Sequence, residues 1–323
     1  MGWFHAARYA KHPGADLVAM ADIDTERMHA EHAVQINLED AERRFDPERL
    51  TRYHNAEDLI ADPDLDVVDI CLPTYLHADA AVAALEAGHH VFCEKPMALT
   101  VEACDRMIEA VARTGRKLMI GQCIRFWPEY VYLRRCIEEE TYGALRSMTM
   151  WRIGARPAWS QRNWFLDPKL SGGPLLDLHI HDVDYVNDVF GWPDRLDITT
   201  RSFGDADRLD AIHACFGYRD GPQIHMRAGW TPVKIPFESG FEAWFDHAVL
   251  RYEDGELRCL TGTTELESDI PPYETGDAYL NEIAYFLGCV DADTDPLRCT
   301  PESTRDSVAL IQEELARVGT RYR

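Results

Sequence analysis

Over residues 1–121, short and nearly continuous apolar runs alternate with segments of helical periodicity. Strands that are buried on both faces of a parallel sheet have such apolar runs, and helices normally connect them. The expected strands are residues 17–22, 66–73, 90–96 and 117–121. The expected helices are residues 2–11, 25–34, 77–88 and 101–115, with a Thr25 cap on the second and a Gly88 stop on the third. This alternation predicts a doubly wound parallel sheet.

After Gly121 the pattern changes to two-residue alternation interrupted by Asp-Gly turns, which is typical of antiparallel strands. The alternating segments are residues 145–153, 197–204, 211–230, 241–247 and 248–262. Two helices are expected at the end of the chain, over residues 278–290 and 301–318, the latter with Pro301 in its first turn. We therefore predict an α/β domain over residues 1–121 and an α+β domain with a large, mainly antiparallel open sheet over residues 122–323.

Composition narrows the range of partners. The chain has 33 basic and 56 acidic residues and a formal net charge of −23, so its average field repels nucleic acid and anionic membranes. The nine cysteines form no CxxC pair and have no zinc-like spacing, which predicts reduced, mostly buried thiols. The sequence has neither a membrane-length apolar run nor a signal-peptide pattern at its start, so a cytoplasmic protein is expected.

Asp22 ends an apolar strand 20 residues after Gly2. This is the usual interval between a glycine-rich turn and the acid that hydrogen-bonds the ribose hydroxyls of NAD. A carboxylate there repels the 2′-phosphate of NADP, so NAD is the expected cofactor. The alternative is that the aspartates of the ADID stretch only cap the following helix.

Two further clusters contain side chains that are suited to catalysis. Lys95, in CEKPMALT, follows a parallel strand at the edge where a doubly wound sheet binds ligands, although an isolated lysine is usually a solvated surface charge. In SGGPLLDLHIHDVD, Asp177 and His181 are four residues apart and share one face of a helical turn. A base and positive charge of this kind are what alcohol oxidation by hydride transfer requires. His179, His181, Asp182 and Asp184 are also competent metal ligands, but positions 179 and 181 point to different helix faces, so no metal is predicted.

With these clusters in this order, the chain resembles the Gfo/Idh/MocA family, which includes glucose-fructose oxidoreductase and inositol dehydrogenase. The matching stretches are PTYLHADAAVAALEAGHHVFCEKPMALT, GQCIRFWPEY and GGPLLDLHIHDVD. The resemblance implies that Lys95 is the catalytic lysine, that His181 is the proton acceptor, and that Asp177 orients the substrate. It also implies a cofactor site that includes Gly2, Asp22, Leu72, Pro73, Thr74, His77, Glu94 and Lys95.

For the substrate, the resemblance implies contacts from Lys95, Asp177 and His181. Arg125 is expected to reach one of the two ligands, Trp164 either walls the pocket or packs in the core, and His179 replaces a glycine common in the family and adds a polar group. Tyr75 stands where the family commonly has asparagine. Met1 and Gly2 match the end of the glycine-rich turn, so the first strand and two glycines are expected to be missing from this sequence, which weakens NAD binding. His5 falls where the family often has a histidine.

The leading hypothesis is an NAD-dependent oxidoreductase that acts on a hydroxyl or keto carbon of a sugar, a cyclitol such as inositol, or a related polyol. Two alternatives stay open: a redox-neutral glycosidase of the same fold that uses NAD transiently, and a non-catalytic binding protein that has lost its cofactor site. The resemblance also implies a homo-oligomer, a dimer or tetramer, formed through the open face of the C-terminal sheet.

Overall fold

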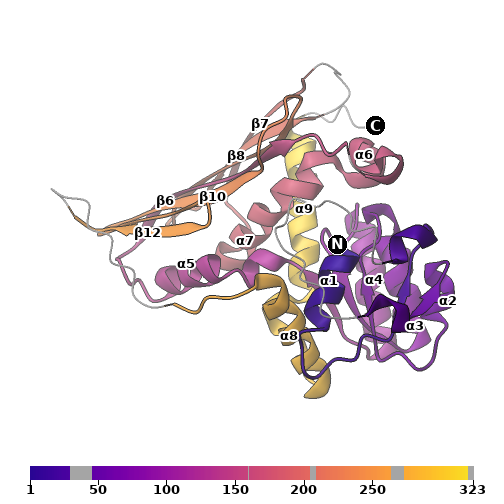
Figure 1. Cartoon of the computed structure of the whole chain (residues 1–323). Coiled ribbons are helices and arrows are strands. Elements are labelled where there is room, and N and C mark those ends of the chain that lie inside the picture. The colour runs from indigo at the N-terminus through magenta and orange to yellow at the C-terminus, as the bar shows by residue number, and fades with distance from the viewer. Residues whose placement is uncertain (30–45, 159, 204–208, 263–272, 319–323) are drawn as a thin grey trace. The chain divides into compact units, whose positions relative to one another are not determined.

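The computed structural model in Figure 1 describes residues 1–29, 46–158, 160–203, 209–262 and 273–318. The Cα positions divide the chain into two compact units. The first unit contains residues 1–98, 102–123 and 276–302, and the second contains residues 99–101, 124–275 and 303–323. The transition at residue 123 lies close to the predicted boundary. The return of residues 276–302 to the first unit was not predicted, and it occurs because this segment packs on the first helix and a central strand.

The first unit is built on parallel strands, which confirms the predicted fold class. Its strands are β1 (Ala19–Ala21), β2 (Thr51–Tyr53), β3 (Val67–Ile70), β4 (His90–Glu94) and β5 (Leu118–Gly121). Among the described residues they form two sheets, one of β1 and β2 and one in the order β3-β4-β5. Most residues of β4 and all of β5 are buried, as their apolar composition requires.

Helices of the first unit follow the predicted pattern in part. They are α1 (Gly2–Tyr9), α2 (Ala56–Ile60), α3 (His77–Ala87), α4 (Val101–Thr114) and α8 (Ala278–Asp291), with short 3₁₀ turns η1 (Thr25–Met28), η2 (Pro47–Arg49), η3 (Thr74–Leu76) and η7 (Leu297–Cys299). Gly88 ends α3 with a φ of 100°, a conformation that favours glycine. The helix predicted over residues 25–34 begins as the 3₁₀ turn η1, and its part from residue 30 lies outside the described residues.

The second unit contains a seven-stranded sheet in the order β12-β11-β10-β6-β9-β8-β7. Its strands are β6 (Leu145–Ala155), β7 (Arg195–Arg201), β8 (Ala211–Gly217), β9 (Gln223–Thr231), β10 (Glu238–Phe245), β11 (Val249–Glu253) and β12 (Glu256–Leu260). Every pair is antiparallel except β6 with β9. The sheet is therefore mainly antiparallel, as predicted.

One face of this sheet is covered by helices α5 (Pro128–Glu138), α7 (Ile180–Phe190) and α9 (Pro301–Arg317), as Figure 1 shows. The shorter turns of this unit are η4 (Cys123–Arg125), η5 (Gln161–Leu166), α6 (Pro168–Ser171) and η6 (Leu175–His179). In β8, Ile212 and Phe216 are buried while His213 between them is exposed. The apolar residues of the alternating pattern thus form the core, and their polar neighbours line the opposite face.

Two predictions from composition can be compared with the structure. All nine cysteines are free, and most of them are buried, as predicted. In the part of the chain that the structure describes, no helix has the length and apolarity needed to cross a membrane.

Candidate functional site

Lys95 follows β4 directly and is half-buried, at the carboxyl end of the parallel strands. Its backbone N–H donates a hydrogen bond of 3.0 Å to Oε2 of Glu94, and the peptide bond to Pro96 is cis. The Glu94 side chain is itself buried. One oxygen of this carboxylate therefore holds the backbone of the turn that carries Lys95, and Glu94 supports this turn.

His77 connects this turn to the loop that precedes it. Nδ1 of His77 lies 2.8 Å from the carbonyl oxygen of Pro96, and Nε2 lies 2.8 Å from that of Leu72. Burial lowers the pKa of His77, although both carbonyl contacts favour its protonated form. Because the ring is buried between two backbone carbonyls, His77 fixes the loop, and its contact with the cofactor stays a prediction.

The other predicted cofactor residues lie at or near strand ends. Leu72 and Pro73 are half-buried, and Thr74 is buried at the start of η3. Asp22 follows β1, and its Oδ1 accepts a hydrogen bond of 2.8 Å from the backbone of Asp24. Local capping and ribose binding are compatible there, since no hydrogen bond among the described residues uses Oδ2 of Asp22.

Gly2 begins α1 beside the end of β3. A β-carbon built on Gly2 would lie 3.8 Å from that of Cys71, which is an ordinary van der Waals distance. The tight packing that the family position implies is therefore absent at this residue.

In the second unit, the predicted Asp177 and His181 lie in an irregular helical segment. Residues Leu175–His179 form a π-helical turn that continues into α7, a conformation that is frequent at functional sites. Every residue from 173 to 186 is buried except Asp177, and His181 is 9% exposed. Asp177 is thus partly exposed, whereas its neighbours in this segment belong to the core.

The Gly-Gly turn before this segment requires glycine for geometric reasons. Gly172 has a φ of 74°, and a β-carbon there would lie 2.4 to 2.8 Å from side-chain atoms of Leu176. Gly173 has a φ of 65°, and its N–H donates a hydrogen bond of 2.9 Å to Oγ of Ser171. The turn therefore fixes the start of the π-helical segment that carries Asp177.

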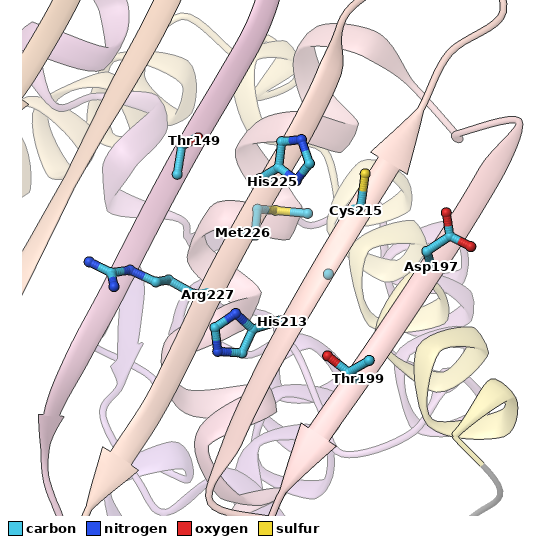
Figure 2. A pocket seen from close by; sticks show the side chains of 9 residues that line it. Thr149, Asp197, Thr199, His213, Cys215, His225, Met226 and Arg227 are labelled. Carbon is cyan, nitrogen blue, oxygen red and sulfur yellow. The ribbon is translucent and has the colours of Figure 1, made fainter.

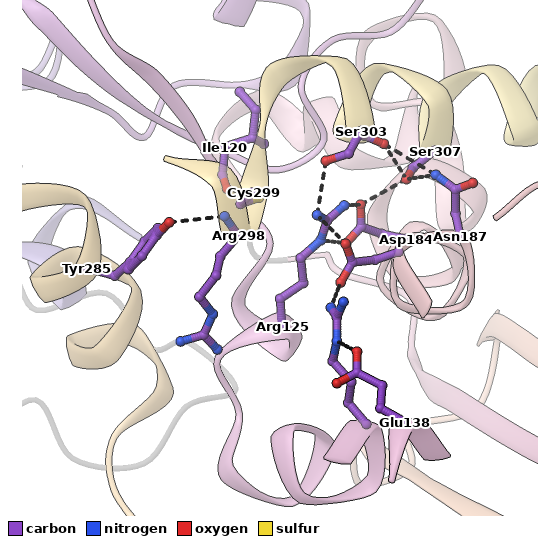
Figure 3. A network of polar contacts seen from close by, with 12 residues as sticks. Ile120, Arg125, Glu138, Asp184, Asn187, Tyr285, Arg298, Cys299, Ser303 and Ser307 are labelled. Carbon is purple, nitrogen blue, oxygen red and sulfur yellow. Dashed lines mark hydrogen bonds and ion pairs between the residues drawn. The ribbon is translucent and has the colours of Figure 1, made fainter. Parts of the chain in front are cut away.

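Arg125 is buried in an ion-pair network, which Figure 3 shows. Its Nε and Nη2 atoms each donate to Asp184 at 2.7 Å, and Nη1 donates to Asp188 and to Oγ of Ser303 at 3.0 Å. Ser307 also donates to Asp184, at 2.8 Å. The prediction that Arg125 contacts a ligand is corrected accordingly: the guanidinium holds α7 and α9 together.

His179 is also turned inward. It has no exposed surface, and its Nε2 lies 3.1 Å from Oε1 of Glu314 on α9, which is equally buried. The neighbouring Asp182 accepts a hydrogen bond of 3.1 Å from Arg152 on β6. His179 therefore does not add a polar group to a substrate pocket, as the sequence had led us to expect, but pairs inside the second unit.

Trp164 lies half-buried in η5 and stacks on Phe165, with ring centroids 4.0 Å apart. This contact is compatible with either of its two interpretations.

Three of the four side chains considered as metal ligands in this segment are paired with other residues instead. Asp182 is paired with Arg152, Asp184 with Arg125, and His179 with Glu314. Among the described residues, the only group of three or more side chains with the spacing of metal ligands is His5, Asp69 and Cys71 in the first unit.

A shallow hollow of about 250 Å³ lies on the helix-free face of the sheet, as Figure 2 shows. It is lined by Thr149, Asp197, Thr199, His213, Ala214, Cys215, His225, Met226 and Arg227. Since Asp177 and His181 belong to the helical layer on the other face, this hollow is separate from the predicted catalytic residues.

Comparisons with known proteins define the class first. Residues 1–122 match the model described as "Oxidoreductase family, NAD-binding Rossmann fold", so the first unit is an NAD-binding Rossmann domain of the oxidoreductase class. Residues 130–242 match the model described as "GFO/IDH/MocA C-terminal domain". The chain belongs to the Gfo/Idh/MocA oxidoreductase family.

Among its relatives, myo-inositol 2-dehydrogenase of Thermotoga maritima is 31% identical over 192 residues, which is 59% of this chain and 52% of that enzyme. Levoglucosan dehydrogenase of Pseudarthrobacter phenanthrenivorans is 33% identical over 194 residues, 59% of this chain and 49% of that enzyme. The chain spans about half the length of the curated relatives it matches. A solved levoglucosan dehydrogenase in complex with NADH and levoglucosan has a TM-score of 0.81 and 21% identity, covering 98% of this chain and 95% of its own, and shares the fold.

Proposed function

We propose that this protein is an NAD-dependent oxidoreductase that transfers a hydride between nicotinamide and a hydroxyl or keto carbon of a sugar, a cyclitol or a related polyol. The main supporting observation is that Asp177 alone is partly exposed in the otherwise buried segment 173–186, four residues before His181, in a chain of this family. The substrates named for the relatives, myo-inositol and levoglucosan, belong to this chemical class.

Each predicted catalytic side chain has a distinct role in this proposal. His181 takes the hydroxyl proton, because an imidazole is a suitable base near neutral pH. Asp177 orients the substrate and the imidazole, and the ammonium of Lys95 stabilises negative charge on the substrate oxygen. Bound NAD supplies the hydride acceptor. Sugars and cyclitols carry several hydroxyls, so a carboxylate and an ammonium at the site also supply hydrogen bonds for binding.

The residues at the strand ends of the first unit fit NAD. The carboxyl edge of parallel strands carries Asp22 after β1, the loop at Leu72 after β3, and Lys95 after β4. His77 and Glu94 hold the last two of these segments in place. Asp22 would accept hydrogen bonds from the ribose hydroxyls, and its negative charge would oppose a 2′-phosphate.

A test of cofactor choice follows from Asp22 and the exposed Ile23 beside it. The D22A/I23R variant should raise the preference for NADP over NAD, measured as the ratio of kcat/KM values, by about 10- to 100-fold. This range corresponds to a charge-assisted hydrogen bond worth about 1.5 to 3 kcal/mol. Asp24→Ala is the matched control and should leave the ratio unchanged, whereas an unchanged ratio in the double variant would remove Asp22 from the cofactor site.

A substrate screen tests the proposed activity and its alternatives. Sugars, inositols and sugar acids are incubated with the protein and NAD or NADP, and the nicotinamide absorbance is followed. A dehydrogenase accumulates NADH with at least one polyol. Cleavage of a glycoside without NADH would support the redox-neutral glycosidase, and the absence of both turnover and NAD binding would support a binding protein. A cytoplasmic location stays a prediction.

We also propose that two or more copies associate through the helix-free face of the C-terminal sheet. Trp244 is 55% exposed on this face, where the described residues include no covering helix. Light scattering should report a dimer or tetramer for the wild-type chain and a shift toward monomer for Trp244→Glu. Trp192→Glu, which changes an equally exposed tryptophan outside the sheet, should have no effect. A wild-type monomer at all accessible concentrations would contradict this proposal.

A further inference from the structure

His5 is the one buried histidine of α1, and it lies between two carboxylates from different strands. Its Nδ1 is 2.8 Å from Oδ2 of Asp69 on β3, and its Nε2 is 3.0 Å from Oε1 of Glu94 on β4. The side chain of His5 is only 1% exposed. This arrangement needs a physical explanation, because both carboxylates beside the buried imidazole are largely shielded from water.

A metal ion is one candidate, since Cys71 Sγ lies 3.5 Å from Nδ1 of His5 and 3.2 Å from Oδ1 of Asp69. Zinc binds nitrogen and oxygen at about 2.0 to 2.2 Å in a tetrahedral arrangement, which separates two such ligand atoms by about 3.4 Å. The separation of 2.8 Å between His5 and Asp69 is instead a hydrogen-bond length. The geometry therefore favours a shared proton over a shared metal ion.

Two carboxylates lie against the ring of His5. Nδ1 contacts Oδ2 of Asp69 at hydrogen-bond distance, whereas the 3.0 Å between Nε2 and Oε1 of Glu94 is an ion-pair distance without hydrogen-bond alignment. Nearby negative charges of this kind favour the protonated imidazole. Burial on its own lowers the pKa of His5, but the negative charge and hydrogen bond of Asp69, with Cys71, outweigh this effect and raise it well above 6.5. Burial also opposes ionisation of Glu94, but contact with His5 lowers its pKa overall.

The other titratable groups around His5 add no negative charge at neutral pH. Burial raises the pKa of the Cys71 thiol to about 12 and that of the Tyr9 hydroxyl well above 10. Burial also raises the pKa of Glu282 on α8 well above its ordinary value, and neither of its carboxyl oxygens has a hydrogen-bond partner among the described residues. The imidazolium of His5 thus faces two anions, Asp69 and Glu94, and Lys95 adds a cation next to Glu94.

Glu94 transmits the position of His5 to the catalytic turn. While Oε1 of Glu94 faces His5, Oε2 accepts the hydrogen bond from the backbone N–H of Lys95. From the other side, His77 contacts the carbonyl oxygen of Pro96. If the carboxylate of Glu94 rotated away from His5, the turn would keep only one of these two restraints.

We propose that His5, as an imidazolium clamped between Asp69 and Glu94, is a positioning residue that fixes the backbone from which Lys95 projects. The charge state of His5 depends only on residues of the first unit, whereas the contribution of His5 to turnover rests on the proposed function.

The charge state is tested by NMR on the full chain labelled with ¹⁵N-histidine, with His5→Gln and His54→Gln used to assign signals. His54 is exposed, and its variant serves as the matched control for assignment. At a pH about 1.5 units above the ordinary pKa of histidine, both ring nitrogens of His5 should still show imidazolium shifts, and Asp69→Asn should abolish them. A His5 that is a neutral tautomer at that pH would overturn the proposal.

The effect on turnover is tested with the same variants. His5→Gln should lower kcat by about 10- to 100-fold, the range expected from a misplaced catalytic group, with NADH affinity and KM changed by about twofold or less. His54→Gln should match the wild type. A wild-type kcat in folded His5→Gln would overturn the positioning role. If the wild-type chain oxidises no polyol, the proposed function fails, and the NMR titration still decides the state of His5.

Discussion

Replacing His181 with asparagine should lower kcat by about 10²- to 10⁴-fold, the contribution typical of a general base. Asparagine keeps the polarity and approximate size of the side chain but cannot take a proton from a substrate hydroxyl. Because asparagine is polar and smaller than histidine, it should fit the space of the buried His181 side chain, so the substitution should leave the fold intact. Stopped-flow or steady-state NADH formation measures the change in kcat, and circular dichroism checks folding.

Lys95→Met should produce a loss of comparable size, since it removes the positive charge that stabilises the substrate oxygen. NADH binding, followed by fluorescence, should persist in the His181 variant. His247→Asn is a matched control, because this histidine is exposed and belongs to the same unit. If His181→Asn or Lys95→Met retained near-normal turnover, the assigned roles would be wrong.

The second large effect is expected on stability. Arg125→Met should lower the free energy of unfolding by about 3 to 5 kcal/mol, because it leaves the buried carboxylate of Asp184 without the guanidinium that neutralises it. Asp184 has no exposed surface, so water cannot replace the lost partner. Urea denaturation followed by circular dichroism measures the change.

Two variants test the cause of this loss. Arg134→Met removes an arginine that also pairs with Asp188 but is 39% exposed, and it should cost about 1 kcal/mol or less. The double variant R125M/D184L should recover part of the stability, since it removes the buried, unpaired charge together with its partner. If Arg125→Met were no more destabilising than Arg134→Met, the network would not hold the helices of the second unit together.

Local chemistry made several elements predictable. Gly88 ends α3 with a left-handed conformation, and Asp254 and Gly255 form the turn between β11 and β12 with φ angles of 52° and 76°. In both cases the residues that determine the conformation are adjacent in sequence. The short β2 and α2 were not predicted, because β2 is recognisable mainly through its pairing with β1, some thirty residues earlier.

Only part of the candidate site could be predicted from the sequence. The strand-end location of Lys95 and the placement of Asp177 and His181 on one helical segment follow from local patterns of apolar residues. The partners of Arg125 and His179 do not, because Asp184 is 59 residues from Arg125 and Glu314 is 135 residues from His179. A polar residue next to a catalytic motif has the same local signature whether it faces a substrate or a buried ion-pair partner.

The regular helical turn expected between Asp177 and His181 was also replaced by a π-helical turn over Leu175–His179. Two glycines with positive φ precede it, and no pattern of apolar positions distinguishes a π turn from an α turn over so short a segment. The two side chains still lie on the same stretch of chain, but their relative direction required the structure.

The central claim is that this chain moves a hydride directly from a polyol carbon to NAD with His181 as the base. The most direct measurement uses a polyol from the screen that carries deuterium on the reacting carbon, with mass spectrometry of the nicotinamide product. The expected product is NADH that carries one deuterium from the substrate. His181→Asn should form this product at a strongly reduced rate. Unlabelled NADH, or turnover of the substrate with no NADH formed, would contradict this claim.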